Sequence, residues 1–439
     1  MLARNRLALV NTAFSDSHLY NLVCDSLALL VGGYLAIYVL GRLKRSRPDL
    51  AIGKPMALAF LLRFLGASSV GLFSISQDLR GPDEQTWFAR ATDLATHTGL
   101  FSDPSTDALT TKLHVFLISI NDRLLDPAPH MMERIEFISL AIVGLALMAT
   151  AVYDLAGPKA ATIAAWILAI EPTNVFFSGV IHKEPLMYLS EGLLAYGGAR
   201  MWKRGELSAV LPLVMGCLIA IATRPYVGWF FLAAAAAVSL HASLRRLDGD
   251  LSLAFLAVGI LAFAIFVPIA LSKSSDKELK SVQQSQDANA SDSNANLSLE
   301  KVDYSTREKV ILNLPKRIRD IVLRPYPWQV ANTSQQLGVL GTMVLFVGLI
   351  LLITSVFKHG GTILRRAGPL VYPALFALIA YALSTGNAGT AYRYRSHVVG
   401  LMLCLLVVLR EQRAEERARS AEAYRGRALQ PATTHGAAP

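Results

Sequence analysis

The 439-residue chain has few charged residues and few cysteines. Asp, Glu, Lys and Arg make up 17% of the chain, against about 25% in an average soluble domain. The three cysteines, Cys24, Cys217 and Cys404, all fall inside apolar runs, and none has the spacing of zinc ligands. We therefore interpret them as small apolar residues within helices and expect no disulfide framework.

Several motifs that carry catalysis in other proteins are missing. The chain has no glycine-rich phosphate loop, no cluster of His, Cys and Asp at metal-ligand spacing, and no Gly-x-Ser-x-Gly turn. Nucleotide-driven chemistry, a zinc centre and a serine hydrolase site are therefore disfavoured.

Long apolar runs dominate the chain instead, and 53% of its residues are hydrophobic. Runs of roughly 17–25 residues recur between Asn21 and Leu409, and each is long enough to cross a hydrocarbon core of about 30 Å. We predict an all-α, polytopic transmembrane helical bundle over residues 1–410 and a charged tail, ending in an Ala/Pro/Thr-rich stretch, over residues 411–439. The predicted spans, about eleven in all, are 21–41, 56–76, 135–153, 160–178, 185–201, 207–223, 226–243, 251–271, 337–357, 369–385 and 397–410.

Basic residues follow the first span and every second span after it. Because short basic loops stay in the cytoplasm, this alternation predicts an outer N-terminus and a cytoplasmic C-terminus in a bacterial-type inner membrane. The net charge of +10 then reflects topology, and we expect no nucleic-acid partner. The basic positions are Arg42, Lys44, Arg45, Arg47 and Lys54; Lys159; Lys203 and Arg204; Arg245 and Arg246; Lys358, Arg365 and Arg366; and the arginine-rich stretch 410–427.

The first of two long outer loops covers residues 77–134. It contains Gly81-Pro82-Asp83-Glu84, which predicts a turn ending in an acidic helix cap. Apolar residues follow at helical spacing and predict an amphipathic helix on the membrane surface. These residues are Trp87, Phe88, Ala91, Leu94 and Ala95.

The second long outer loop covers residues 272–336. Its first half, 272–298, is rich in Ser, Asp, Asn, Gln and Lys, and we expect it to be a flexible tether. Its second half carries an apolar stripe from Val310 to Val322 among basic residues, which predicts a second interfacial helix. That helix leads into Arg324-Pro325-Tyr326-Pro327-Trp328.

Five polar clusters occupy the outer ends of the spans: Asp83-Glu84, His182-Lys183-Glu184, Thr223-Arg224-Pro225-Tyr226, the stretch 324–328 and the stretch 387–395. Charges at a membrane boundary are costly unless they pair or line a wet cavity. Several at one level therefore predict a shared cavity.

The residue types in these clusters indicate chemistry on a phosphate-linked donor. Guanidinium and ammonium groups hold phosphate and stabilise its developing charge, and a carboxylate can take the proton of an attacking hydroxyl. We assign phosphate binding to Lys183, Arg224, Arg393 and Arg395. We assign catalysis to Asp83 and Glu84, and substrate contacts to Glu184, Tyr226, Arg324, Trp328 and Asn387.

Most of these clusters also have a purely structural explanation. Asp83 could be only a helix cap, and Lys183 with Glu184 could be an interfacial ion pair. Arg324 and Trp328 could be an interfacial anchor, where such residues are common. Arg393 and Arg395 fit a structural explanation less well, because arginines at an outer helix end run against the positive-inside trend.

The segment Gly-Pro-Asp-Glu-Gln-Thr-Trp-Phe-Ala-Arg-Ala (81–91) resembles the acidic motif in the first large outer loop of GT-C-type glycosyltransferases. That class includes protein mannosyltransferase-like and aminoarabinose transferase-like enzymes. The segments 178–185 and 393–395 are similar to elements of bacterial polysaccharide-cluster membrane proteins. The resemblance implies that Asp83, and after it Glu84, acts as the base or positions the acceptor. It also implies a polyprenyl-phosphate-linked sugar and a glycan or lipid-linked acceptor as partners.

The chain departs from the GT-C pattern in two respects. Its acidic loop follows the second span, whereas the family's loop usually follows the first. In addition, we expect no C-terminal soluble outer domain.

Three functions remain open from the sequence. The first is a membrane glycosyltransferase of cell-envelope or exopolysaccharide synthesis, and the second is an O-antigen-type repeat-unit polymerase or ligase that uses a lipid diphosphate. The third is a transporter or flippase, which Glu171-Pro172 and Glu191 within the spans would suit. We expect no cofactor, because the lipid-linked sugar would be a substrate, and a role for a divalent metal stays open.

Overall fold

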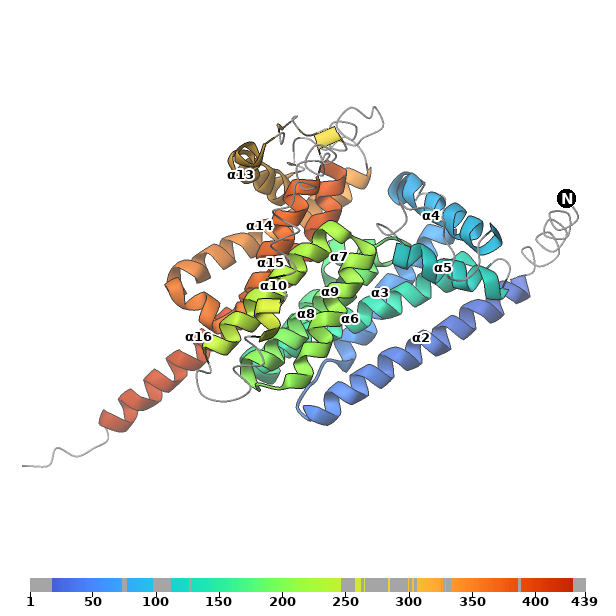
Figure 1. Ribbon diagram of the computed structural model, residues 1–439. Coiled ribbons are helices and arrows are strands. Elements are labelled where there is room, and N and C mark those ends of the chain that lie inside the picture. Colours follow the sequence, from blue (N-terminus) through green and yellow to red (C-terminus); the bar gives the residue numbers. More distant parts are fainter. Residues whose placement is uncertain are drawn as a thin grey trace, which may run out of the picture.

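The computed structural model describes residues 18–72, 77–97, 112–125, 128–245, 257–261, 306–324, 333–385 and 388–428, with isolated positions between 264 and 328. These residues are mostly helical and contain no strand, which confirms the predicted all-α class. The principal helices (Figure 1) are α2 (His18–Ser46), α3 (Gly53–Leu72), α4 (Gln77–His97), α5 (Lys112–Leu125), α6 (His130–Ile170), α7 (Pro172–Ser178), α8 (Glu184–Lys203), α9 (Val210–Thr223), α10 (Pro225–Leu244), α13 (Arg307–Leu323), α14 (Thr333–His359), α15 (Ile363–Ser384) and α16 (Ala388–Ala428), with 3₁₀ turns η3 (Leu207–Ala209) and η5 (Gly360–Thr362).

Six helices among the described residues are long and apolar enough to cross a membrane: α2, α6, α10, α14, α15 and α16. The stretch Leu207–Thr223 is a shorter apolar helix. These helices support the predicted helical membrane bundle, while the count of about eleven spans stays a prediction. The predicted span 251–271 lies outside the described residues except at 257–261 and 264.

Helix α6 contains two of the predicted spans. Its backbone leaves the helical region at Gly157, which has φ 85°, directly before Pro158. A Cβ placed on Gly400 of α16 would lie 3.7 Å from Leu168 and 3.9 Å from Met148. In a straight helix those two residues would be about 30 Å apart, so the chain reverses at Gly157. The second half ends at Ile170 rather than at residue 178, because Glu171 and Pro172 start α7.

Helices α6 and α8 cross with their backbones in close contact. A Cβ placed on Gly144 would lie 2.3 Å from the Tyr188 carbonyl oxygen, and one placed on Gly192 would lie 2.2 Å from the Gly144 carbonyl oxygen. Glycine therefore lets the two backbones touch, as small residues commonly do between membrane helices.

Replacing Gly192 with alanine is expected to destabilise the protein by about 1–3 kcal/mol, because overpacking forces the two helices apart. The measurement is the midpoint of thermal unfolding in detergent. Gly33→Ala on α2 is the control, since a Cβ there meets nothing within 4 Å. Equal unfolding midpoints for Gly192→Ala and Gly33→Ala would show that α6 and α8 can move apart without loss of stability.

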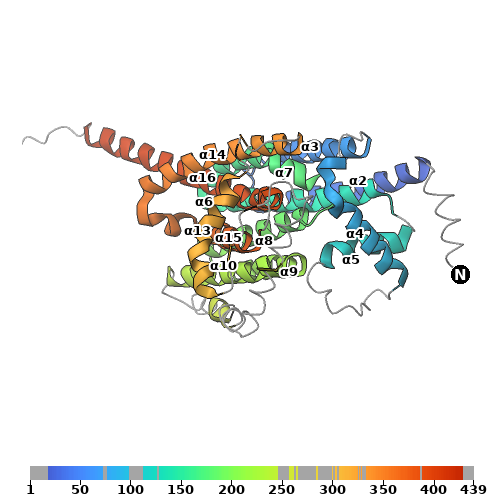
Figure 2. The ribbon, with the colours of Figure 1, turned by 90° about the horizontal axis from the view of Figure 1, so that it is seen from above.

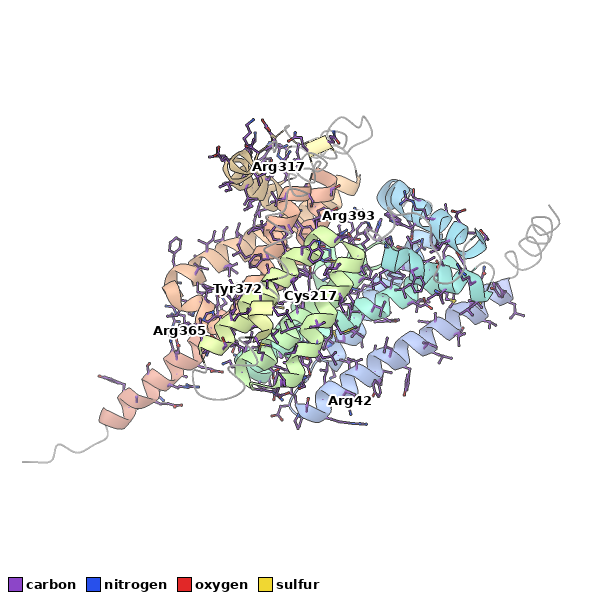
Figure 3. All side chains as sticks on the ribbon, in the orientation of Figure 1. Arg42, Cys217, Arg317, Arg365, Tyr372 and Arg393 are labelled. Atoms are coloured by element: carbon purple, nitrogen blue, oxygen red, sulfur yellow. The ribbon has the colours of Figure 1, made fainter. Side chains whose placement is uncertain are left out.

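The predicted cytoplasmic loops contact one another at one end of the bundle. Asp154 accepts hydrogen bonds from Arg47 and Arg204, both at 3.0 Å. The other contacts are Lys159 with Glu411 at 3.1 Å, and Trp202 and Arg245 with the Arg365 carbonyl oxygen at 3.3 and 2.9 Å. Figure 3 shows Arg42 and Arg365 at the lower end of the bundle and Arg393 at the upper end. These loops thus lie at one end of the bundle, as the basic segments after every second predicted span led us to expect.

Both predicted outer helices form at the upper end of the bundle, apart from one another (Figures 1 and 2). Thr306 caps helix α13, because its hydroxyl oxygen accepts a hydrogen bond from the Lys309 backbone N–H at 3.3 Å. Helix α4 begins at Gln77, so Gly81 to Glu84 lie inside it, and the predicted turn and acidic cap are wrong. Helices α4 and α5 pack against α6 and the start of α8 through the cluster Ala91, Val115, Ile118, Phe137, Ile181 and Leu186. The apolar face of α4 is thus covered largely by protein.

Candidate functional site

Three of the polar clusters lie at helix ends, and proline residues mark two of these ends. Arg224 separates α9 from α10 with φ −144° and ψ 86°, because Pro225 disfavours a helical conformation in the residue before it. Helix α8 begins at Glu184 with Pro185 in its first turn, and α16 begins at Ala388, a few residues before Arg393. The three ends meet at the upper end of the bundle.

Glu184 is the centre of the candidate site. Its Oε1 atom accepts a hydrogen bond from Arg224 Nη2 and lies 3.2 Å from Arg393 Nε. Glu184 and Arg224 are buried, while the Arg393 side chain is 21% exposed. A ligand at this end of the bundle would therefore reach Arg393 first.

Tyrosine rings surround the Arg224 guanidinium group. Its central carbon lies 4.4 Å from the centre of the Tyr394 ring, and the Tyr381 ring lies 4.8 Å from the Tyr394 ring. The Tyr226 hydroxyl donates a hydrogen bond to the Tyr394 hydroxyl at 3.1 Å. These contacts hold the cation through its face and leave its edge for hydrogen bonding. Tyr226 was predicted as a site residue, whereas Tyr381 was not.

Lys183 precedes Glu184 in the chain, and its ammonium group packs against aromatic side chains. Its ammonium nitrogen is 4.7 Å from the Trp87 ring centre, and Trp87 meets the His114 ring edge-on at 4.6 Å. Burial, followed by the positive charge of Lys183, lowers the pKa of His114 well below its usual range. His114 is therefore neutral at pH 7. Neither of its ring nitrogens has a hydrogen-bond partner among the described residues.

Glu84 is held by Arg134, a residue that the sequence analysis did not single out. Arg134 Nε and Nη2 each donate to Glu84 Oε1 at 3.0 Å, and the Ile181 N–H donates to the same oxygen at 3.2 Å. Both side chains are buried. Glu84 thus links α4 to α6 and to the segment leading into Lys183. The Asp83 side chain and Asn387 lie outside the described residues.

Arg395 and Arg324 occupy a neighbouring group of contacts. Arg395 donates to the Arg324 carbonyl oxygen at 2.7 Å and to the Thr342 hydroxyl at 2.6 Å, and it is 1% exposed. It therefore ties α16 to the end of α13 and to α14. The Arg324 Nε atom lies 3.5 Å from Asp320. Trp328 is 79% exposed and stacks on Tyr326 at 4.8 Å.

A second buried polar group lies one to two turns along α8 and α16 from Glu184. His397 Nδ1 lies 3.2 Å from Glu191 Oε1, and both side chains are fully buried. The Tyr188 hydroxyl donates to Ser396 at 2.8 Å. Glu191 was noted within its span, but nothing in the sequence predicted its partner.

Glu171, which the sequence analysis considered as a transport signal, has a structural role. Its carboxylate accepts hydrogen bonds from the N–H groups of Thr173 at 3.1 Å and Asn174 at 2.6 Å, and so caps α7. Arg63 donates to Asn174 and Ser178 at 2.7 Å each and joins α3 to the same helix. The capping contact removes one of the two observations that suited a transporter.

The chain matches no protein-family description, and none of the curated proteins matches it. Among solved structures, it is similar to the archaeal oligosaccharyltransferase AglB from Archaeoglobus fulgidus, in complex with an inhibitory peptide and a dolichol-phosphate. The sequence identity is 14% and the TM-score is 0.43. The match covers 80% of this chain and 50% of AglB, so the chain spans about half the length of that protein. A likeness of this size carries no functional conclusion.

Proposed function

We propose that the protein is a membrane glycosyltransferase that moves a sugar from a polyprenyl-phosphate donor to a glycan or lipid-linked acceptor at the outer face of the inner membrane. The observation that carries the proposal is the group formed by Lys183, Arg224, Arg393 and Glu184. Three permanent positive charges and one carboxylate leave a net charge of +2 at one end of an apolar bundle. A lipid phosphate suits this place, because its tail stays in the bilayer while its head reaches the cations.

The proposed chemistry is a displacement at the anomeric carbon of the sugar. The oxygen of the acceptor hydroxyl forms a bond to that carbon, and the bond between the carbon and the phosphate oxygen breaks. The hydroxyl proton passes to the Asp83 carboxylate, and the electron pair leaves with the polyprenyl phosphate. Arg393 and Lys183 hold the phosphate as its negative charge grows.

The remaining residues would position this machinery. Glu184 and the tyrosine rings orient Arg224. Arg395 fixes the start of α16, which carries Arg393, through its contacts with Arg324 and Thr342. Tyr326 and Trp328 form an exposed aromatic pair that suits stacking on a sugar ring or burial at the membrane interface.

The second candidate is a polymerase or ligase acting on a lipid diphosphate. The ion pair of Glu84 with Arg134 favours it, because Glu84 is engaged by a cation and is therefore a weaker candidate for the base. A mechanism without a carboxylate base would then rest on the cations alone.

The lipid-linked intermediate that accumulates after deletion of the gene separates the two candidates. The proposal predicts an intermediate, or a finished polymer, that lacks one sugar. Accumulation of complete but unpolymerised repeat units would favour the polymerase and overturn the transferase.

The proposal requires the Glu184 group to lie on the outer face of the membrane. Reporter fusions at Arg47, Asp303 and Arg425 test this directly. A reporter that is active only outside the cytoplasm is expected to work at Asp303 and to fail at the other two positions. The opposite pattern would place the candidate site in the cytoplasm and contradict an outer-face reaction.

A further inference from the structure

The predicted cytoplasmic end of the bundle contains a basic cavity that has no part in the proposed transfer. It has a volume of about 480 Å³ and lies between the end of α14, the η5 turn, the start of α15 and the extension of α16. Its lining residues are Lys358, His359, Thr362, Arg366, Arg413, Glu416, Arg417 and Ser420.

The charge of this cavity is strongly positive. Four permanent cations, Lys358, Arg366, Arg413 and Arg417, face one carboxylate, Glu416, which leaves a net charge of +3. Glu416 is already engaged by Arg366 at 2.7 Å, and this hydrogen bond lowers the pKa of Glu416. The carboxylate is therefore ionised and paired at pH 7, and the other three cations exceed the available negative charge.

The arrangement of the cavity suits an anion with several oxygen atoms. Arg413, Arg417 and Ser420 share one face of α16 at helical spacing, and the pairing of Arg366 with Glu416 holds that face over the start of α15. At the end of α14, His359 Nδ1 forms a hydrogen bond with the Ser355 carbonyl oxygen at 2.7 Å. Its buried Nε2 atom has no hydrogen-bond partner in the described part of the chain.

The surroundings of the cavity place it at a membrane boundary. Lys358 and His359 end a helix that is long and apolar enough to span the bilayer. Next to them, Phe357 is 82% exposed, and Leu364 beyond the turn is 41% exposed. Figure 1 shows α16 continuing past the rest of the bundle at this end. A headgroup in the cavity would therefore have apolar side chains beside it for its acyl chains.

We propose that this cavity binds the phosphate headgroup of an anionic phospholipid from the cytoplasmic leaflet. Basic pockets between membrane helices on this side are suited to such headgroups. The arginines would donate to the phosphate oxygens, as guanidinium groups do in pairs with phosphate. The bound lipid would join the α16 extension to the α14–α15 turn.

The test is a titration of the purified, delipidated full-length protein with short-chain phosphatidylglycerol, followed by native mass spectrometry. The double variant Arg413→Gln/Arg417→Gln is expected to bind about twenty-five-fold more weakly than the unaltered protein. This is about five-fold for each arginine, the equivalent of about 1 kcal/mol per basic side chain near an anionic surface. The matched control is Arg419→Gln/Arg425→Gln, which removes the same charge from the same helix outside the cavity and should bind as the unaltered protein does.

Two further measurements distinguish a lipid headgroup from free phosphate. Phosphatidylcholine of the same chain length should bind at least ten-fold more weakly than phosphatidylglycerol, and millimolar inorganic phosphate should not displace the lipid. Displacement by free phosphate would reassign the cavity to a soluble anion and overturn the proposal. Equal loss of binding in the two double variants would also overturn it, because it would reflect the overall charge of α16. Elution volume in detergent confirms that each variant is folded.

Discussion

Replacing Asp83 with asparagine is expected to lower the rate of sugar transfer by ~10²–10⁴-fold, the usual cost of removing a general base. Asparagine keeps the shape of the side chain and removes its basicity. A capping role cannot explain such a loss, because residue 83 lies inside α4 rather than at its start. The rate is measured in membranes from a strain that lacks the native gene, with protein level controlled by immunoblot.

Two variants on the same helix sharpen the Asp83 experiment. Asp93→Asn removes an equal charge about three turns further along α4. It should retain near-normal transfer. Glu84→Gln weakens the buried contact with Arg134 and should lower the amount of folded protein more than the rate per molecule. Full turnover in Asp83→Asn would remove Asp83 as the base and favour the base-free polymerase mechanism.

Replacing Glu184 with glutamine is expected to destabilise the protein by about 3–5 kcal/mol. The change leaves the Arg224 and Arg393 guanidinium groups side by side without their shared carboxylate, and breaking a buried ion pair from one side has a cost of this order. The measurement is the free energy of unfolding in mixed micelles. Arg200→Gln, which breaks a partly exposed pair with Glu206 at the other end of α8, should cost at most about 1 kcal/mol.

The double variant Glu184→Gln/Arg224→Gln separates stability from function. It leaves neither partner of the buried pair charged, so most of the lost stability should return. The net charge of the group stays at +2, but Arg224 is no longer a cation and Arg393 has lost the carboxylate that holds its guanidinium group. Sugar transfer should therefore stay well below that of the unaltered protein. Recovery of both stability and transfer would mean that the pair is only structural and that the candidate site lies elsewhere.

The fold was largely predictable because its signal is local. Apolar runs of membrane length predict a helical membrane bundle, and the predicted cytoplasmic loops do meet at one end through Asp154, Glu411 and the Arg365 carbonyl oxygen. The start of α4 was not predictable in this way. Gly81 and Pro82 are typical of a turn, but packing of α4 on α5 and α6 overrides that local preference.

The candidate site was predictable only in part, because pairing depends on distance in space. Arg224, Glu184 and Arg393 stood out as charges at span ends, and the structure brings them together. Arg134 was missed, although it is a charge at the very start of a span and so gave the same signal. His397 was also missed, since a lone histidine in an apolar run carries no sign of its partner Glu191.

The central claim is that the group around Glu184 holds the phosphate of a polyprenyl carrier. Because undecaprenyl phosphate is the expected product whatever the sugar, its binding to the purified protein is the most direct measurement. Saturable binding is predicted, with a loss of about ten-fold or more in Arg393→Lys, which keeps the charge but lacks the bidentate fork. The variant Arg413→Gln/Arg417→Gln, at the opposite end of the bundle, should bind the carrier normally. Equal affinity in the unaltered protein and in Arg393→Lys, or loss only in Arg413→Gln/Arg417→Gln, would contradict the account.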